Sequence, residues 1–157
     1  HPEGLTGGAL AELLADDRLD EVSVRAEVSR LRRVFGPDVV ASRPYRLAPG
    51  ALVTDLREVT DALDSGDVMR AVASYPGPLL PASDAPGVAD LRLEVHSMVR
   101  AAVLSADRLP VLRAWVGGAG REDLAAWRSL ARSRYADAST IAAAEARCRV
   151  LDQRFGA

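Results

Sequence analysis

The sequence predicts a mainly α-helical protein with one small β-hairpin. Hydrophobic residues make up 48% of the 157 residues, alanine and leucine are abundant and only 4% are aromatic, a composition that favours helices. Apolar residues recur at helical spacing through most of the chain, and turns rich in glycine or proline separate these segments. The β-prone stretch from Val39 to Leu47 is the exception, because Arg43-Pro44 at its centre indicates a tight hairpin.

The segment 24–36 is the most informative of the predicted helices. Its apolar side chains fall at positions i, i+4, i+7 and i+11, which lie on one face of an α-helix: Val24, Val28, Leu31 and Phe35. Gly36-Pro37 ends the helix, since proline cannot continue it and glycine suits a C-terminal cap. We expect the apolar face to pack against the core of the domain.

The water-facing side of this helix and the hairpin behind it are both rich in arginine. A basic helix followed at once by a basic hairpin is how winged-helix proteins hold DNA. Arginine can donate two parallel hydrogen bonds to phosphate oxygens or to guanine edges in the major groove, and arginines on the hairpin would meet phosphates or the minor groove. The candidate DNA-binding residues are Arg25, Ser29, Arg30, Arg32, Arg33, Arg43, Tyr45 and Arg46.

Each of these residues also has a simpler interpretation. The arginines could form an ordinary solvated helix face, particularly because every basic residue counted in the chain is arginine. Tyr45 is expected to pack on its own domain rather than to stack on a base. Glu27 is expected to pair with Arg30, three residues further along the helix.

The helix and the hairpin resemble a known family of DNA-binding domains. The run Val28-Ser29-Arg30-Leu31-Arg32-Arg33 resembles the recognition helix of OmpR/PhoB-type winged helices, and Pro44-Tyr45-Arg46-Leu47 takes the place of their Gly-Tyr-Arg-Leu wing. The resemblance implies a winged helix-turn-helix over residues 1–50. Leu5-Thr6 resembles the start of the second helix of that fold, so we expect an N-terminally truncated winged helix in this chain.

Residues 51–157 predict a series of short helices with tight turns, which favours antiparallel helical hairpins. In the long helix 88–106, the candidate core positions are Leu91, Val95, Met98, Ala102 and Leu104. This half resembles the bacterial transcriptional activator domain of actinobacterial antibiotic regulatory proteins, including Tyr75-Pro76-Gly77-Pro78-Leu79-Leu80 at its connector. The resemblance implies a helical-hairpin (TPR-like) bundle that associates with itself or with the transcription machinery.

Charge is distributed unevenly along the chain. The net charge is −2 and the isoelectric point is near 5.7, so no global charge favours nucleic acid. Residues 18–50, however, carry seven arginines against Asp20, Glu21, Glu27 and Asp38. Local basicity of this kind is what a DNA footprint requires.

Other site chemistries find little support in the sequence. Cys148 is the only cysteine, which excludes a disulfide within one chain or a cysteine-based zinc cluster and fits a reducing cytoplasm. His96 has no metal-ligand partners at suitable spacing, and Trp115 and Trp127 are expected to fill the core between helices. We therefore predict no enzyme activity, no cofactor and no membrane-spanning segment.

Together these patterns predict the C-terminal effector region of a larger bacterial regulator. Its winged helix would bind double-stranded DNA sequence-specifically and control transcription, and its helical module would contact a second copy or the transcription machinery. The alternative is a protein-interaction or oligomerisation module whose winged helix does not bind DNA, which the acidic isoelectric point and Glu27 favour.

Overall fold

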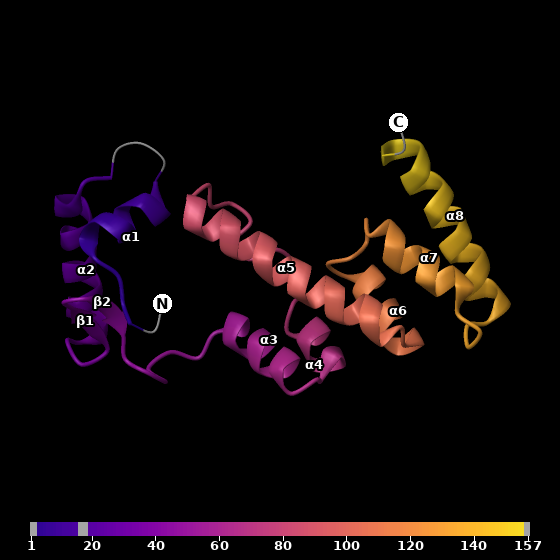
Figure 1. The fold of residues 1–157 in the computed structure, drawn as a ribbon, viewed down its shortest axis with the longest axis horizontal. Helices are drawn as coiled ribbons and strands as arrows, with labels where there is room; N and C mark the ends of the chain where they lie inside the picture. Colours follow the sequence, from indigo (N-terminus) through magenta and orange to yellow (C-terminus); the bar gives the residue numbers. More distant parts are fainter. Residues whose placement is uncertain (1–2, 16–18, 156–157) are drawn as a thin grey trace. The chain divides into compact units, whose positions relative to one another are not determined.

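A computed structural model describes residues 3–15 and 19–155 (Figure 1). The chain forms two compact units, and helix α5 contributes to both. The N-terminal unit comprises residues 1–54 and 79–93, and the helical unit comprises residues 55–78 and 94–157. The first division lies close to the boundary expected at residue 50, but residues 79–93 group with the N-terminal unit.

The N-terminal unit contains two helices and a hairpin: α1 (Gly7–Leu14), α2 (Glu21–Phe35), β1 (Val40–Ser42) and β2 (Tyr45–Leu47). Thr6 caps α1 by accepting the Ala9 N–H at 3.2 Å, as its position predicts. Asp20 caps α2 in the same way. Gly36 ends α2 with a φ of +94°, in the left-handed region that glycine adopts without strain.

The hairpin has the predicted position and a third, short partner. Val40 pairs with Leu47 and Ser42 with Tyr45 in antiparallel register. Leu5 and Tyr45 also exchange two backbone hydrogen bonds, each of 2.9 Å. The core beneath the hairpin consists of Ala11, Val24, Val28 and Val40, with Leu10, Leu19, Val39 and Tyr45 packed against it.

The apolar face of α2 is buried only over its first half. Val24 and Val28 are 1% and 6% exposed, whereas Leu31 and Phe35 are 46% and 47% exposed. The expectation of a fully buried stripe is therefore wrong for its last two residues. Among the described residues of this unit, Val28 is the last buried residue of α2. The rest of the unit therefore covers the side chains of the last turns of α2 only in part.

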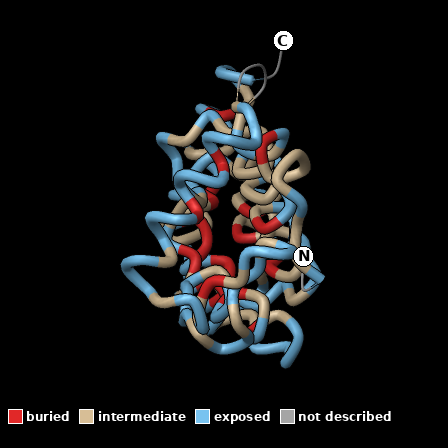
Figure 2. The backbone as a smooth tube through the Cα atoms, turned by 90° about the vertical axis from the view of Figure 1, so that its left-hand side faces the viewer, coloured by how far each residue is buried: buried red, intermediate tan, exposed pale blue. Residues whose placement is uncertain are grey.

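The helical unit contains α3 (Asp55–Asp64), α4 (Val68–Ala73), the last part of α5 (Pro86–Ala106), α6 (Leu109–Gly117), α7 (Leu124–Arg132) and α8 (Ala138–Phe155). Neighbours in the sequence pack on one another, α3 on α4, α6 on α7 and α7 on α8, and α4 also packs on α6. This confirms a mainly helical fold. Figure 2 shows that the buried positions recur along one side of the helices while other sides are exposed.

The core of this unit differs in part from the predicted one. Along α5 the buried residues are Val95, Val99 and Val103, which repeat every fourth position, and Met98 is 41% exposed. The expectation that Met98 is a core residue is therefore wrong, because it lies beside this valine stripe rather than on it. Trp115 is fully buried, as predicted, and Trp127 is half-buried with its indole N–H donated to the Arg121 carbonyl at 2.9 Å.

The proline-rich connector between α4 and α5 is held by side-chain hydrogen bonds rather than by regular structure. Arg92 donates to the carbonyl oxygens of Leu79, Leu80 and Ser83 at 2.7, 2.6 and 2.8 Å. Gly87 at the start of α5 lies so close to Leu13 that an added Cβ would be 2.9 Å from its side chain. One arginine thus supplies donors to three carbonyls that lie outside any helix or strand.

Candidate functional site

The exposed side of α2 carries four of the eight residues predicted to bind DNA. Arg25, Ser29, Arg30 and Arg33 are all exposed, whereas Val24 and Val28 face the core. Arg30 is paired with Glu27 at 2.5 Å, as predicted, and both side chains remain more than 60% exposed. A pair this exposed contributes little to stability, so Arg30 can exchange Glu27 for another anion at small cost.

Arg32 differs from its neighbours because it is half-buried. Its guanidinium donates to the backbone carbonyl of Val40. This hydrogen bond joins the last turn of α2 to the first residue of the hairpin. The position of Arg32 therefore gives it a structural role in holding the helix against the hairpin.

The hairpin places its arginines in solvent. Arg43 and Arg46 are exposed, and Tyr45 is half-buried against the core of the unit, as its simpler interpretation predicts. Arg25 of α2 and Arg43 of the hairpin tip line the same groove of about 370 Å³. Glu21 also lines this groove, so two cations and one carboxylate lie along it. The fold thus brings Arg25 of the helix and two predicted residues of the hairpin, Arg43 and Tyr45, to a common groove. Ser29, Arg30 and Arg33 lie elsewhere on α2.

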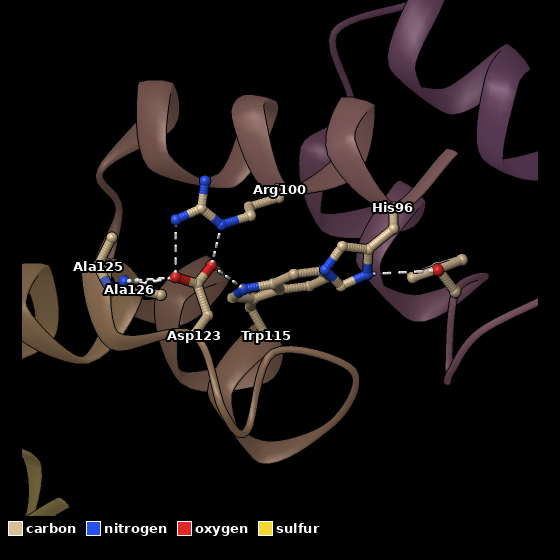
Figure 3. A network of polar contacts seen from close by, with 7 residues as sticks. His96, Arg100, Trp115, Asp123, Ala125 and Ala126 are labelled. Carbon is tan, nitrogen blue, oxygen red and sulfur yellow. Dashed lines mark hydrogen bonds and ion pairs between the residues drawn. The ribbon is translucent and has the colours of Figure 1, made fainter. Parts of the chain in front are cut away.

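The helical unit contains a polar network centred on Asp123, shown in Figure 3. Arg100 of α5 donates Nε to Asp123 Oδ2 at 2.8 Å and a terminal nitrogen to Oδ1 at 3.1 Å. Trp115 of α6 donates its indole N–H to Oδ2 at 3.1 Å. Asp123 also caps α7 by accepting the N–H groups of Ala125 and Ala126. One carboxylate, whose side chain is only 5% exposed, therefore connects three helices.

Aromatic rings extend this network toward α4. The His96 ring centroid lies 5.3 Å from that of Trp115 and 6.0 Å from that of Tyr75, whose hydroxyl is 3.4 Å from His96 Nδ1. Gly120 passes over the indole so closely that an added Cβ would lie 2.0 Å from Trp115 Nε1. Glycine is thus required at this position, because any larger residue would displace the loop or the tryptophan.

A groove of about 1110 Å³ opens beside this network. His96, Arg100 and Leu104 line one wall from α5, and Arg128, Ser129 and Arg132 line the other from α7. Residues of the loop between α6 and α7 also line it. This surface lies outside all the residues predicted to bind DNA.

Sequence reasoning did not find this second site. It interpreted His96 as a histidine without metal-ligand partners at suitable spacing. Asp123 caps α7, but its partners Arg100 and Trp115 are 23 and 8 residues away. The sequence places Trp115 and Gly120 shortly before the capping residue Asp123, and this combination could have indicated the contact between Trp115 and Asp123. Arg100 could not be found in this way, because only the packing of α5 brings it to Asp123.

Metal and thiol chemistry find little support among the described residues. Within 3–15 and 19–155 no three His, Cys, Asp or Glu side chains form a group that could hold a metal ion. Cys148 is half-buried rather than fully buried, and burial raises the pKa of its thiol, which disfavours the reactive thiolate at neutral pH. None of the helices in those two ranges is long and apolar enough to cross a membrane.

Two comparisons with known proteins give matches. Residues 109–157, which hold α6 to α8, match the family described as YTH3-like protein, third C-terminal helical domain. The chain is also 40% identical, over 157 residues, to an uncharacterised 47.3 kDa protein in the thcA 5′ region of Rhodococcus erythropolis. The alignment covers 99% of this chain and 36% of the relative, so the chain spans about a third of the length of the relative. No solved structure matches the chain.

Proposed function

We propose that the N-terminal unit binds double-stranded DNA sequence-specifically and that the chain acts as the C-terminal effector region of a larger bacterial transcription regulator. The observation that carries the proposal is the arrangement of α2 and the hairpin, which brings Arg25 and Arg43 to one groove. The helix lies with Arg25, Arg30 and Arg33 in solvent and with Val24 and Val28 in the core, and a helix that enters a major groove needs such an exposed polar face.

The resemblance of this unit to OmpR/PhoB-type winged helices supports the same function. The resembling run from Val28 to Arg33 lies on α2, and Tyr45-Arg46-Leu47 forms β2. Within the proposal, Arg25, Ser29, Arg30 and Arg33 face base edges and phosphates, and Arg43 and Arg46 meet the backbone beside the wing. Arg32 and Tyr45 act indirectly, because they hold the helix and the wing in place.

The helical unit is proposed to contact a second copy of the chain or the transcription machinery. Its resemblance to a bacterial transcriptional activator domain supports this role. The matched relative is more than twice as long as this chain, which leaves room for further domains in a protein of that layout.

The proposal is tested by selecting duplexes from a random DNA pool with the full chain and measuring affinity for the selected duplex across a salt titration. We expect enrichment of a common sequence and an affinity that falls steeply with salt, because phosphate contacts release counterions. Arg25→Ala should cost about 1–3 kcal/mol of specific binding if Arg25 reads a base edge. No enrichment, and no binding at low salt, would refute DNA recognition.

A second candidate function is protein interaction or oligomerisation by a winged helix that does not bind DNA. Glu21 within the groove of Arg25 and Arg43, and the exposed Leu31 and Phe35 on α2, favour it. An exposed apolar surface is a usual property of a protein interface. In that case Leu31→Ser would lower the oligomeric mass measured by light scattering, and no duplex would bind at low salt.

A further inference from the structure

The groove of the helical unit is large for a small-molecule site. Its volume is about 1110 Å³, above the range of about 300–1,000 Å³ typical of small-molecule pockets. It lies between α5 and α7, and its walls are helix faces on which side chains repeat at one-turn spacing: His96, Arg100 and Leu104, and opposite them Arg128 and Arg132. A groove whose lining follows two helices in this way suits an extended segment better than a compact ligand.

The charges in the groove are not balanced within the unit. Asp123 engages Arg100, Asp152 engages Arg128 at 2.8 Å, and Arg154 engages Glu122. Arg121 and Arg132 also line the groove and are exposed, and neither forms an ion pair within the described part of the chain. Two cations thus remain without a carboxylate, one in the loop before α7 and one in the last turn of that helix.

We propose that this groove binds an extended acidic peptide segment of a partner protein, with carboxylates of the peptide on Arg132 and Arg121. Arginine forms short, charge-assisted and often bidentate hydrogen bonds with carboxylates. Leu104 and Leu124 line the same groove and offer apolar contacts to the side chains between the acids. The inference rests on the part of the proposed function that gives the helical unit a protein partner, and it does not require DNA binding.

The groove suits a peptide better than a nucleic acid. Glu122 and Asp123 also line it, and a continuous phosphate backbone would pass close to both carboxylates. A peptide can place its acids opposite the two arginines and neutral residues elsewhere. The discrete spacing of the uncompensated cations therefore matches side chains on a peptide rather than a uniform line of phosphates.

The test is a selection of random short peptides, displayed on phage, against the immobilised full chain. Peptides enriched by the wild type should be richer in Asp and Glu than the unselected pool. Their affinities are then measured by fluorescence anisotropy for Arg132→Glu, Arg121→Glu and the matched control Arg108→Glu, which reverses the charge of an exposed arginine outside the groove. Replacing glutamate by glutamine in the best peptide tests the peptide side of the contact.

We expect Arg132→Glu and Arg121→Glu to weaken the selected peptides by about tenfold to a hundredfold, the loss that corresponds to one charge-assisted hydrogen bond. Arg108→Glu should leave their affinity unchanged, and circular dichroism should show all three variants folded. Selected peptides without acidic enrichment, or equal affinity for all variants, would overturn the proposal. So would a variant that loses duplex DNA affinity and keeps peptide affinity. Failure of DNA recognition alone would leave peptide binding intact, so the two proposals are tested separately.

Discussion

The two units engage their arginines to different degrees. In the helical unit Arg100, Arg128 and Arg154 each engage a carboxylate, and Arg100 helps to join α5 to the start of α7. In the N-terminal unit Arg25 and Arg43 line a groove and form no ion pair within the described residues. Arginines already engaged by carboxylates stabilise a fold, whereas arginines left in solvent on a rigid helix and hairpin remain available to an external anion.

The cores of the two units also differ, because the helical unit buries larger side chains. Trp115, Leu112 and Leu151 are completely buried in the helical unit, while the N-terminal core consists of four small or medium residues and leaves Leu31 and Phe35 about half-exposed. Because burial of apolar area is the main stabilising contribution in folding, the helical unit should unfold at higher denaturant concentration. Both tryptophans lie in the helical unit, so tryptophan fluorescence follows that unit alone.

The largest effect is expected for Asp123→Ala. The change removes the cap of α7 and leaves the Trp115 N–H and Arg100 without their acceptor, so we expect a loss of about 3 kcal/mol in the free energy of unfolding. The control Glu122→Ala breaks only an exposed pair with Arg154 and should cost below about 1 kcal/mol. Denaturation followed by tryptophan fluorescence measures both, and equal losses would show that the network does not hold the unit together.

Gly120→Ala should destabilise the helical unit by about 2 kcal/mol, the usual cost of forcing an extra methyl group into packed surroundings. The new Cβ would lie within 2.3 Å of three atoms of the Trp115 ring. Gly117→Ala, at the last residue of α6, is the matched control, since its added Cβ meets nothing within 4 Å. A shift of the tryptophan emission maximum in Gly120→Ala but not in Gly117→Ala would place the effect at Trp115. Identical behaviour of the two variants would contradict this prediction.

In the N-terminal unit Arg32→Ala should cost about 1 kcal/mol, the net contribution of one hydrogen bond. It removes the donor to the Val40 carbonyl that joins α2 to the hairpin. Arg33→Ala removes an exposed neighbour instead and should leave stability unchanged while weakening DNA affinity. Amide hydrogen exchange at Val28 and Ala41 follows this unit, and faster exchange in Arg33→Ala than in Arg32→Ala would reverse the assigned roles.

The smallest effect concerns pH and compares the caps of the two units. The backbone N–H of Ser23 lowers the pKa of Asp20 at the start of α2, and the backbone N–H of Thr140 lowers that of Asp137 before α8. Because a lowered pKa in the folded state stabilises the ionised form, each contribution is present above the ordinary aspartate pKa and is lost as pH falls through the folded value. Helix content measured by circular dichroism should therefore fall at acid pH. Asp20→Asn, which keeps a capping acceptor, should reduce the pH dependence for α2; an unchanged profile would exclude this cause.

The local features of the fold could be predicted from the sequence. Thr6 as a cap, Gly36 as a helix end and the hairpin around Arg43-Pro44 depend on neighbours a few residues away. Which apolar residues are buried depends on distant helices, and this is why Met98 was misplaced and Val99 and Val103 were missed. The Asp123 network was missed for the same reason, since the sequence separation of 23 residues to Arg100 carries no periodic signal.

The candidate DNA site likewise has features that nearby residues predict and one that depends on a distant contact. Arg25, Arg30 and Arg33 were expected in solvent from the phase of the helix, and they are exposed. The half-buried position of Arg32 could not be predicted, because it depends on the approach of the Val40 carbonyl from the hairpin. Whether these side chains bind DNA stays a prediction that only binding measurements test.

The most direct test of whether the DNA contacts lie in the N-terminal unit is the salt dependence of binding to the selected duplex. The logarithm of affinity is measured against the logarithm of salt concentration for the wild type, for Arg43→Ala combined with Arg46→Ala, and for Arg108→Ala combined with Arg113→Ala in the helical unit. If the hairpin arginines contact phosphates, the first double variant should lower the magnitude of the slope by about two, and the second should match the wild type. Equal slopes for all three proteins, or a loss confined to the helical-unit variant, would contradict the assignment of DNA contacts to the N-terminal unit.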